Sequence, residues 1–261
     1  MKTVLSILAL AAGLALGGAA AAEAETIKIG VTPGPHAQIL EAVKPLAAKK
    51  GLTIEIVEFS DYVVPNQALD SGDIQANSFQ HKPYLDNQKT DRGFKIDSVA
   101  ETVNFPIGVY STKYKSFDEV PAGSTIAIPN DPTNGGRVLL LLQDRGVLKL
   151  KDGVGLKPTV ADIADNPKKL KILEVDAAQT PRTLDDVAAA AINTNYATAA
   201  GIKPSDTILK ENPKGPYVNV IAVRTADKDK PWVKTLVETY RSPEVKAFIE
   251  TTFKGAVLPS W

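Results

Sequence analysis

The stretch TIKIGVTPGPHAQILEAVKPLAAKKGLTIEIVEF, residues 26 to 59, sets the expected class of fold. Residues 26–31 form an apolar run typical of a buried strand, and the Pro33-Gly34-Pro35 breaker ends it. A helix is predicted from about His36 to Lys50, where a glycine stops it. Residues 52–59 then alternate between apolar and polar side chains, as a strand does. This β-α-β order predicts an α/β protein with an open sheet.

A second cycle of the same kind begins near Thr125. Strand-like segments near residues 105 and 220 join the two cycles without a flexible linker, which predicts two lobes connected by more than one crossing. We expect residues 23–105 to form the first lobe, with 222–261 returning to it, and residues 106–221 to form the second. A ligand cleft is expected between the lobes, where the strands end. The other predicted elements are helices at 66–71, 137–144, 183–187, 196–200, 231–240 and 243–253, and strands at 107–110, 125–129, 170–175, 188–192 and 217–223.

The composition is that of a soluble globular protein with a sizeable core, 44% apolar and 23% charged. Lys plus Arg and Asp plus Glu are 30 each, so the formal net charge is zero. A nucleic-acid partner is therefore not expected. The chain has no cysteine, which excludes cysteine-ligated zinc and thiol nucleophiles.

The first 22 residues have the pattern of a secretory signal peptide. Lys2 supplies the positive charge, Val4 to Leu16 the apolar region, and Ala19 to Ala24 the small residues before cleavage. Cleavage is expected after Ala22 or after Ala24, with the mature protein in the periplasm.

Several loops carry polar side chains at expected strand ends. In NDPTNGGR, residues 130–137, free N–H groups at a helix start attract an anion and Arg137 can hold a carboxylate bidentately. The alternative is a capped helix with Arg137 on a solvated face. Asn193 and Asn219 are amides within apolar strands and need partners, which a ligand can supply as well as the backbone.

The stretch ANSFQHKPYLD, residues 76–86, holds one of the two histidines of the chain, and a loop is expected over 77–84. His81 is open to three interpretations: a wall of a small-molecule pocket, a catalytic base, or a metal ligand. A metal site would combine His36 and His81 with Asp61 or Asp131, and two histidines are few for such a site. Catalysis has little support, because no GxSxG or HExxH motif is present.

Five segments in order resemble the methionine-binding, NlpA-like lipoprotein family, the substrate-binding components of methionine ABC importers. The resemblance runs from Ile27 to Trp261. Its most specific segments are DYVVPNQAL (61–69), ANSFQHKPYL (76–85), IPNDPTNGGRVLLLLQ (128–143), DIADNPKKLKI (162–172) and AINTNYA (191–197), with PYVN (216–219).

The resemblance implies a two-lobed periplasmic-binding-protein fold of type II that closes on a free amino acid, L-methionine in the first place. It implies no catalysis, no cofactor and no metal. It places Arg137 on the ligand's carboxylate, assigns Asn193 and Asn219 to its amino and carboxylate groups, and gives Asn134 a further contact. The expected wall of the side-chain pocket consists of Tyr62, Phe79, His81 and Tyr84, whose rings suit a polarizable thioether.

One departure from the family concerns the anchor. Its members are usually tethered by a lipidated cysteine after the signal sequence, and residues 14–22, LALGGAAAA, have none. We therefore expect a soluble monomer whose partner is the membrane permease of an ABC importer. The alternative ligands are D-methionine, a methionyl dipeptide or another small amino acid, and the alternative class is an exported enzyme acting on an amino-acid derivative.

Overall fold

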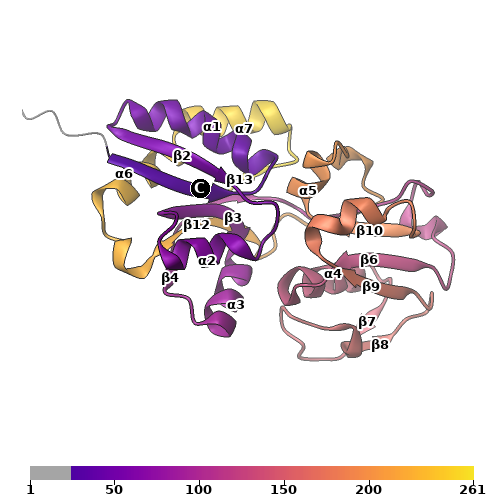
Figure 1. Cartoon of the computed structure of the whole chain (residues 1–261). Coiled ribbons are helices and arrows are strands. Elements are labelled where there is room, and N and C mark those ends of the chain that lie inside the picture. Colours follow the sequence, from indigo (N-terminus) through magenta and orange to yellow (C-terminus); the bar gives the residue numbers. More distant parts are fainter. Residues whose placement is uncertain (1–24) are drawn as a thin grey trace, which may run out of the picture.

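A computed structural model describes residues 25–261, so the expected signal peptide and its cleavage sites lie outside the described residues. Figure 1 shows two lobes side by side, each built around its own sheet. None of the helices in the described part is long and apolar enough to span a membrane.

The first lobe holds a six-stranded sheet in the order β13-β4-β12-β3-β1-β2. The neighbouring strands β3, β1 and β2 run parallel, whereas β12 is antiparallel to both β3 and β4. Its strands are β1 (Glu25–Val31), β2 (Leu52–Glu58), β3 (Ala76–His81), β4 (Ile96–Asn104), β12 (Val218–Arg224) and β13 (Leu258–Pro259).

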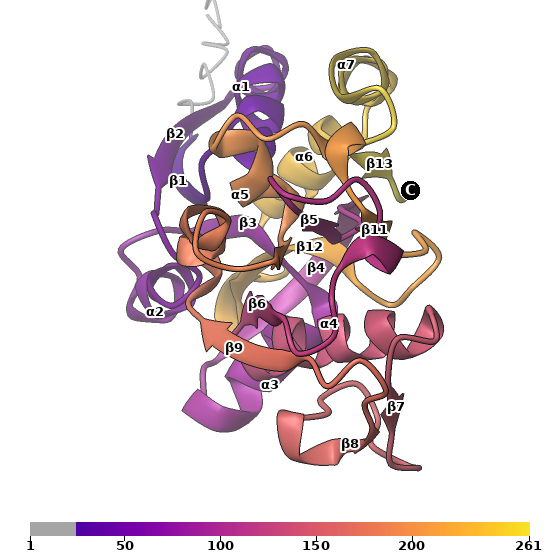
Figure 2. The ribbon, with the colours of Figure 1, turned by 90° about the vertical axis from the view of Figure 1, so that its right-hand side faces the viewer.

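Helices cover both faces of this sheet. α1 (Pro35–Ala48), α6 (Pro231–Tyr240) and α7 (Pro243–Phe253) share one apolar core with it. α2 (Val64–Ser71) and α3 (Lys82–Arg92) pack on the opposite face. In Figure 2, which looks at the molecule from the second lobe, α1 and α7 lie above the sheets and α3 below them. All five helices have a proline in the first turn, where its missing N–H costs nothing.

The second lobe holds a five-stranded sheet in the order β11-β5-β10-β6-β9, flanked by α4 (Pro132–Asp144) and α5 (Thr194–Ala199). A separate two-stranded ribbon, β7 with β8, lies at its outer end. The strands are β5 (Gly108–Tyr110), β6 (Thr125–Pro129), β7 (Lys149–Leu150), β8 (Ile163–Asp165), β9 (Lys171–Val175), β10 (Ala189–Ile192) and β11 (Leu209–Lys210).

The chain crosses between the lobes twice, after β4 and again after β11. The return crossing precedes Val218, because β12 pairs with β3 and β4 from that residue onward. Residues 218–221, which the sequence analysis assigned to the second lobe, therefore lie in the sheet of the first.

Three local predictions are wrong. Residues 77–84, expected to form a loop, are instead the last five residues of β3 and the first three of α3. Residues 183–187 do not form the expected helix. A 3-10 helix spans Ala177–Thr183 instead. α4 begins at Pro132, five residues before its predicted start, because the Asp131 carboxylate caps it by accepting from the backbone N–H groups of Thr133 and Asn134.

Candidate functional site

A small cavity lies where the ends of the two sheets meet. All eight residues predicted from the sequence line it: Tyr62, Phe79, His81, Tyr84, Asn134, Arg137, Asn193 and Asn219. Five further lining residues were not predicted as ligand contacts: His36, Gln80, Phe105, Thr194 and Asn195.

One side of the cavity is a wall of aromatic rings. The ring centroid of Tyr62 lies 5.9 Å from that of Phe79, 6.0 Å from that of Tyr84 and 4.8 Å from that of Tyr196. The Tyr84 hydroxyl donates to the backbone carbonyl of Tyr62 over 2.8 Å, which holds the Tyr84 ring against this segment. Such a wall buries an apolar ligand group and offers ring edges to a thioether.

His81 joins the aromatic wall to the polar end of the cavity. Its Nδ1 accepts from the backbone N–H of Tyr84 over 3.0 Å, so the ring caps α3. The proton of the neutral ring is therefore on Nε2, which donates to Asn134 Oδ1 over 3.2 Å. Burial, together with the positive charge of Arg137, lowers the pKa of His81 to about 3. His81 is thus a neutral donor and no base at neutral pH.

His36 is the second buried histidine on the cavity wall. It packs its ring on Phe105 with a centroid distance of 4.6 Å, and burial lowers its pKa to about 3. Both histidines therefore fold in the neutral form, whereas the unfolded chain protonates them near pH 6.5.

This pKa difference predicts that the protein loses stability in weak acid. Below about pH 6.5 the unfolded chain binds more protons than the folded one, so the free energy of unfolding falls as pH falls. Between pH 6 and pH 5 each histidine should contribute a loss of about 1 kcal/mol. Urea unfolding at both pH values measures it. His81→Asn, which preserves a capping side chain, should remove about half of the loss, and an unchanged pH dependence in that variant would contradict the neutral assignment.

Two amides form the polar end. Asn134 Oδ1 accepts from Asn193 Nδ2 over 2.9 Å as well as from His81, and Asn134 Nδ2 donates to Asp131 Oδ2 over 2.9 Å. These bonds set the orientation of Asn193, whose Oδ1 is buried and has no hydrogen-bond partner within residues 25–261. A buried acceptor left in this way favours a ligand that brings a donor, such as an ammonium group.

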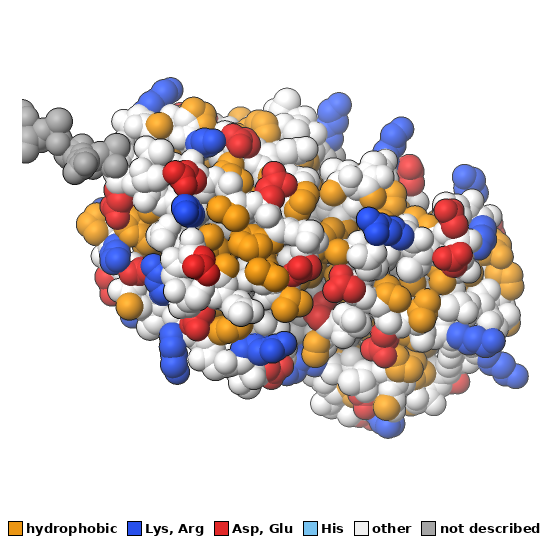
Figure 3. All heavy atoms as spheres, viewed as in Figure 1, with side chains coloured by type: hydrophobic (Ala, Val, Ile, Leu, Met, Phe, Trp, Pro, Cys, Tyr) orange, Lys and Arg blue, Asp and Glu red, His pale blue; other side chains and the backbone are white. Residues whose placement is uncertain are grey.

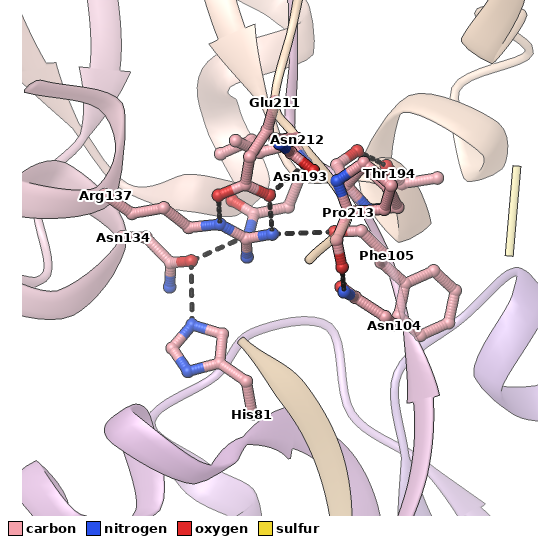
Figure 4. A network of polar contacts seen from close by, with 12 residues as sticks. His81, Asn104, Phe105, Asn134, Arg137, Asn193, Thr194, Glu211, Asn212 and Pro213 are labelled. Atoms are coloured by element: carbon pink, nitrogen blue, oxygen red, sulfur yellow. Dashed lines mark hydrogen bonds and ion pairs between the residues drawn. The ribbon is translucent and has the colours of Figure 1, made fainter. Parts of the chain in front are cut away.

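Arg137 lies beside these amides and is 2% exposed. Its Nε and Nη2 donate to the two carboxylate oxygens of Glu211 over 2.8 and 2.5 Å, and Nη2 also donates to the Phe105 carbonyl. Figure 4 shows Glu211 on one side of the guanidinium and His81 on the other. Arg137 is thus not on a solvated face, and the bidentate geometry that the sequence analysis expected for a ligand is occupied by Glu211. Within the described chain Nη1 has no hydrogen-bond partner, so it is the nitrogen left for a ligand.

Asn219 is on β12, directly opposite His81 on the neighbouring strand β3. Its side chain is 5% exposed and makes no hydrogen bond to any residue between 25 and 261. It lines the same cavity as Arg137 and Asn193. An amide in this position can both donate and accept, so a ligand carboxylate or ammonium would satisfy it.

Hydrogen bonds from both lobes close the cleft around this cavity. The Tyr62 hydroxyl donates to Asn195 Oδ1 over 2.6 Å, and Asn195 Nδ2 donates to Thr32 Oγ1 over 3.2 Å. The Tyr196 hydroxyl reaches the Ser60 carbonyl at 3.3 Å. The structure is therefore a closed form, with a cavity enclosed between the two lobes.

A metal centre finds no support from this arrangement. His36 and His81 both reach the cavity, yet residues 25–261 contain no group of three or more His, Cys, Asp or Glu side chains placed to hold a metal ion. On the face in Figure 3, basic and acidic side chains are interspersed over both lobes, without the single-sign field of a nucleic-acid binder.

The cavity suits a small zwitterion with an apolar tail. One guanidinium nitrogen and the Asn219 amide are available for a carboxylate, and Asn193 Oδ1 for an ammonium. The rings of Tyr62, Phe79 and Tyr84 are available for the tail.

Comparison with known proteins gives the same picture. The family model described as NlpA lipoprotein matches residues 27–261. The D-methionine-binding lipoprotein MetQ of Salmonella typhimurium is 50% identical, over 100% of this chain and 98% of the relative. A nutrient-binding protein from Burkholderia cenocepacia, solved bound to methionine, is 56% identical with a TM-score of 0.88, covering 90% of this chain and 100% of that one. An ABC transporter periplasmic substrate-binding protein from Coxiella burnetii is 45% identical with a TM-score of 0.86, covering 90% and 100%.

Proposed function

The chain belongs to the NlpA lipoprotein family, and from that premise we propose that it is an extracytoplasmic binding protein that captures methionine and delivers it to an ABC importer. The observation that carries the proposal is the pairing of unsatisfied polar groups with an aromatic wall in one enclosed cavity. Arg137 Nη1 and Asn219 receive the carboxylate, and Asn193 Oδ1 receives the ammonium. The thioether tail is held by Tyr62, Phe79, Tyr84 and the ring face of His81. Asn134 orients the side chains of His81 and Asn193, to which it is hydrogen-bonded.

The chemistry of the lining favours binding over catalysis. The two histidines have pKa values near 3 and cannot accept a proton at neutral pH. The hydroxyls of Tyr62 and Thr194 already donate to Asn195 and to the Pro106 carbonyl. These groups hold a ligand without an activated nucleophile beside it, so an exported enzyme is the weaker alternative.

We propose L-methionine as the ligand, taken up by a protein that acts as a monomer in the periplasm. The relative in Salmonella typhimurium carries D-methionine in its name, so both enantiomers belong in any titration. Relatives are named as lipoproteins, but this chain has no cysteine to carry a lipid. We therefore propose that it works untethered, which fractionation of exported protein into soluble and membrane pools tests.

Mass spectrometry of the small molecules released by denaturing the purified protein tests the ligand. A cleft closed by several hydrogen bonds releases its ligand slowly, so about one methionine per chain should be recovered. Recovery of a different compound, combined with a failure of the stripped protein to bind either enantiomer of methionine, would overturn the proposal.

The aromatic wall predicts a modest preference for methionine over norleucine. Replacing sulfur by a methylene keeps the shape of the tail and removes sulfur–aromatic contacts worth about 0.3–1.5 kcal/mol, or roughly twofold to tenfold in affinity. Competition calorimetry measures the ratio. Glutamate serves as the contrasting ligand, because its charged tip would be buried among rings without a partner. Binding of glutamate as tightly as methionine would contradict the apolar tail pocket.

A further inference from the structure

The charge of Arg137 is already compensated before any ligand binds. Among the thirteen described residues that line the cavity, Arg137 alone carries a charge, because both histidines are neutral. Glu211 lies outside the lining and pairs with Arg137 from the side opposite His81, as Figure 4 shows. The guanidinium therefore offers the cavity hydrogen-bond donors without an uncompensated positive charge.

Glu211 is held in this position by more than Arg137. Its Oε2 also accepts from the backbone N–H of Ile107 over 3.2 Å, and its side chain is 11% exposed. Glu211 directly follows β11, at the start of the return crossing. The ring of Tyr217, later in the same crossing, lies 4.3 Å from the Arg137 guanidinium carbon. The ion pair is therefore enclosed on several sides and keeps one geometry.

The surroundings add a second negative charge. Asp131 accepts from Asn134 at the base of the polar end. A ligand carboxylate that enters beside Arg137 therefore meets one positive and two negative protein charges. Its own ammonium, bound at Asn193 Oδ1, cancels the charge of that carboxylate, so a zwitterion adds no net charge to the site. A ligand that has the carboxylate and lacks the ammonium leaves an uncompensated negative charge in a buried site, which disfavours its binding.

We propose that Glu211 is a specificity-determining residue that restricts the cavity to zwitterions and excludes simple carboxylate anions. The inference rests on the proposed function, since it concerns the same cavity. Glu211 does not touch the ligand: it sets the charge of the arginine that does. The Glu211 carboxylate thus determines that the cavity binds amino acids and not the corresponding acids that lack the amine.

The test compares L-methionine with 4-(methylthio)butanoate, which has the same skeleton without the amine. Calorimetry gives the dissociation constant of 4-(methylthio)butanoate divided by that of L-methionine, for the wild type and for Glu211→Gln. Removing the negative charge should improve binding of the anion relative to methionine, so that the ratio falls by about tenfold or more. Glu211→Asp retains the charge and should keep a ratio close to that of the wild type, which separates charge from shape.

Glu174→Gln is the matched control, because Glu174 is exposed on β9 and its removal changes the net charge by the same amount. A ratio in Glu211→Gln equal to that in Glu174→Gln overturns the inference. So does a wild-type protein that binds the two ligands within threefold of each other. Glu211→Ser, a smaller neutral variant, repeats the test if thermal unfolding shows that Glu211→Gln is poorly folded. If the wild-type protein does not bind methionine at all, the result refutes the proposed function and not the inference about Glu211.

Discussion

Arg137→Met is expected to lower the affinity for methionine by about thirtyfold to several thousandfold, which corresponds to roughly 2–5 kcal/mol. The physical reason is the loss of Nη1, the guanidinium nitrogen without a protein partner in the described chain, which we assign to the ligand carboxylate. Calorimetric titration of the ligand-stripped variant measures the change directly.

Stability has to be separated from binding in this variant. Without Arg137, Glu211 is left as a buried charge with no cationic partner, and breaking such a pair costs about 3–5 kcal/mol of folding free energy. The double variant Arg137→Met/Glu211→Gln removes that charge. It should recover most of the unfolding free energy and none of the affinity. A double variant that binds methionine within threefold of the wild type would show that Arg137 acts only through the fold.

Asn193→Leu is expected to have the second large effect, a loss of at least about tenfold in affinity, or 1.4 kcal/mol. Leucine has a similar volume and removes the buried Oδ1 to which we assign the ligand's ammonium. Fluorescence or calorimetric titration checks it. Asn130→Leu is the control, because Asn130 is exposed just after β6, outside the cavity. Equal affinities for the two variants would place the ammonium elsewhere.

The alternation of strands and helices was predictable where single segments carry strong local signals. β1, α1 and β2 begin and end within two residues of their predicted bounds, because apolar periodicity and the proline and glycine signals agree there. β6, α6 and α7 match their predicted bounds for the same reason. α3 was missed, since only Tyr84, Leu85 and Asn87 of its eleven residues are buried and its apolar stripe is correspondingly weak.

The residues that line the cavity were more predictable than the residues that support them. The eight predicted contacts were carried by the family motifs, and all of them line the cavity. Thr194 and Asn195 lie inside the quoted AINTNYA segment and could have been added from it. His36 was considered only as a catalytic base or a metal ligand.

Glu211 had no signal in the sequence. The segment LKENPKGP around it has the composition of a solvated turn. Its carboxylate meets Arg137, 74 positions away in the sequence, only because the return crossing passes behind α4. The pairing also reverses the simplest view of Arg137, which at the first turns of a helix is more often solvated than buried. Long-range contacts of this kind follow from topology, and local pattern carries no information about them.

The central claim is that the cavity between the lobes binds free methionine through its carboxylate and ammonium groups. Titration calorimetry of L-methionine into the protein, stripped of ligand by unfolding and refolded, tests it most directly. We predict saturable binding of one methionine per chain, and no measurable binding of methionine amide or N-acetylmethionine, each of which loses one of the two charges. Absence of heat with either enantiomer of methionine, or equal affinities for methionine and its two blocked derivatives, would contradict the account.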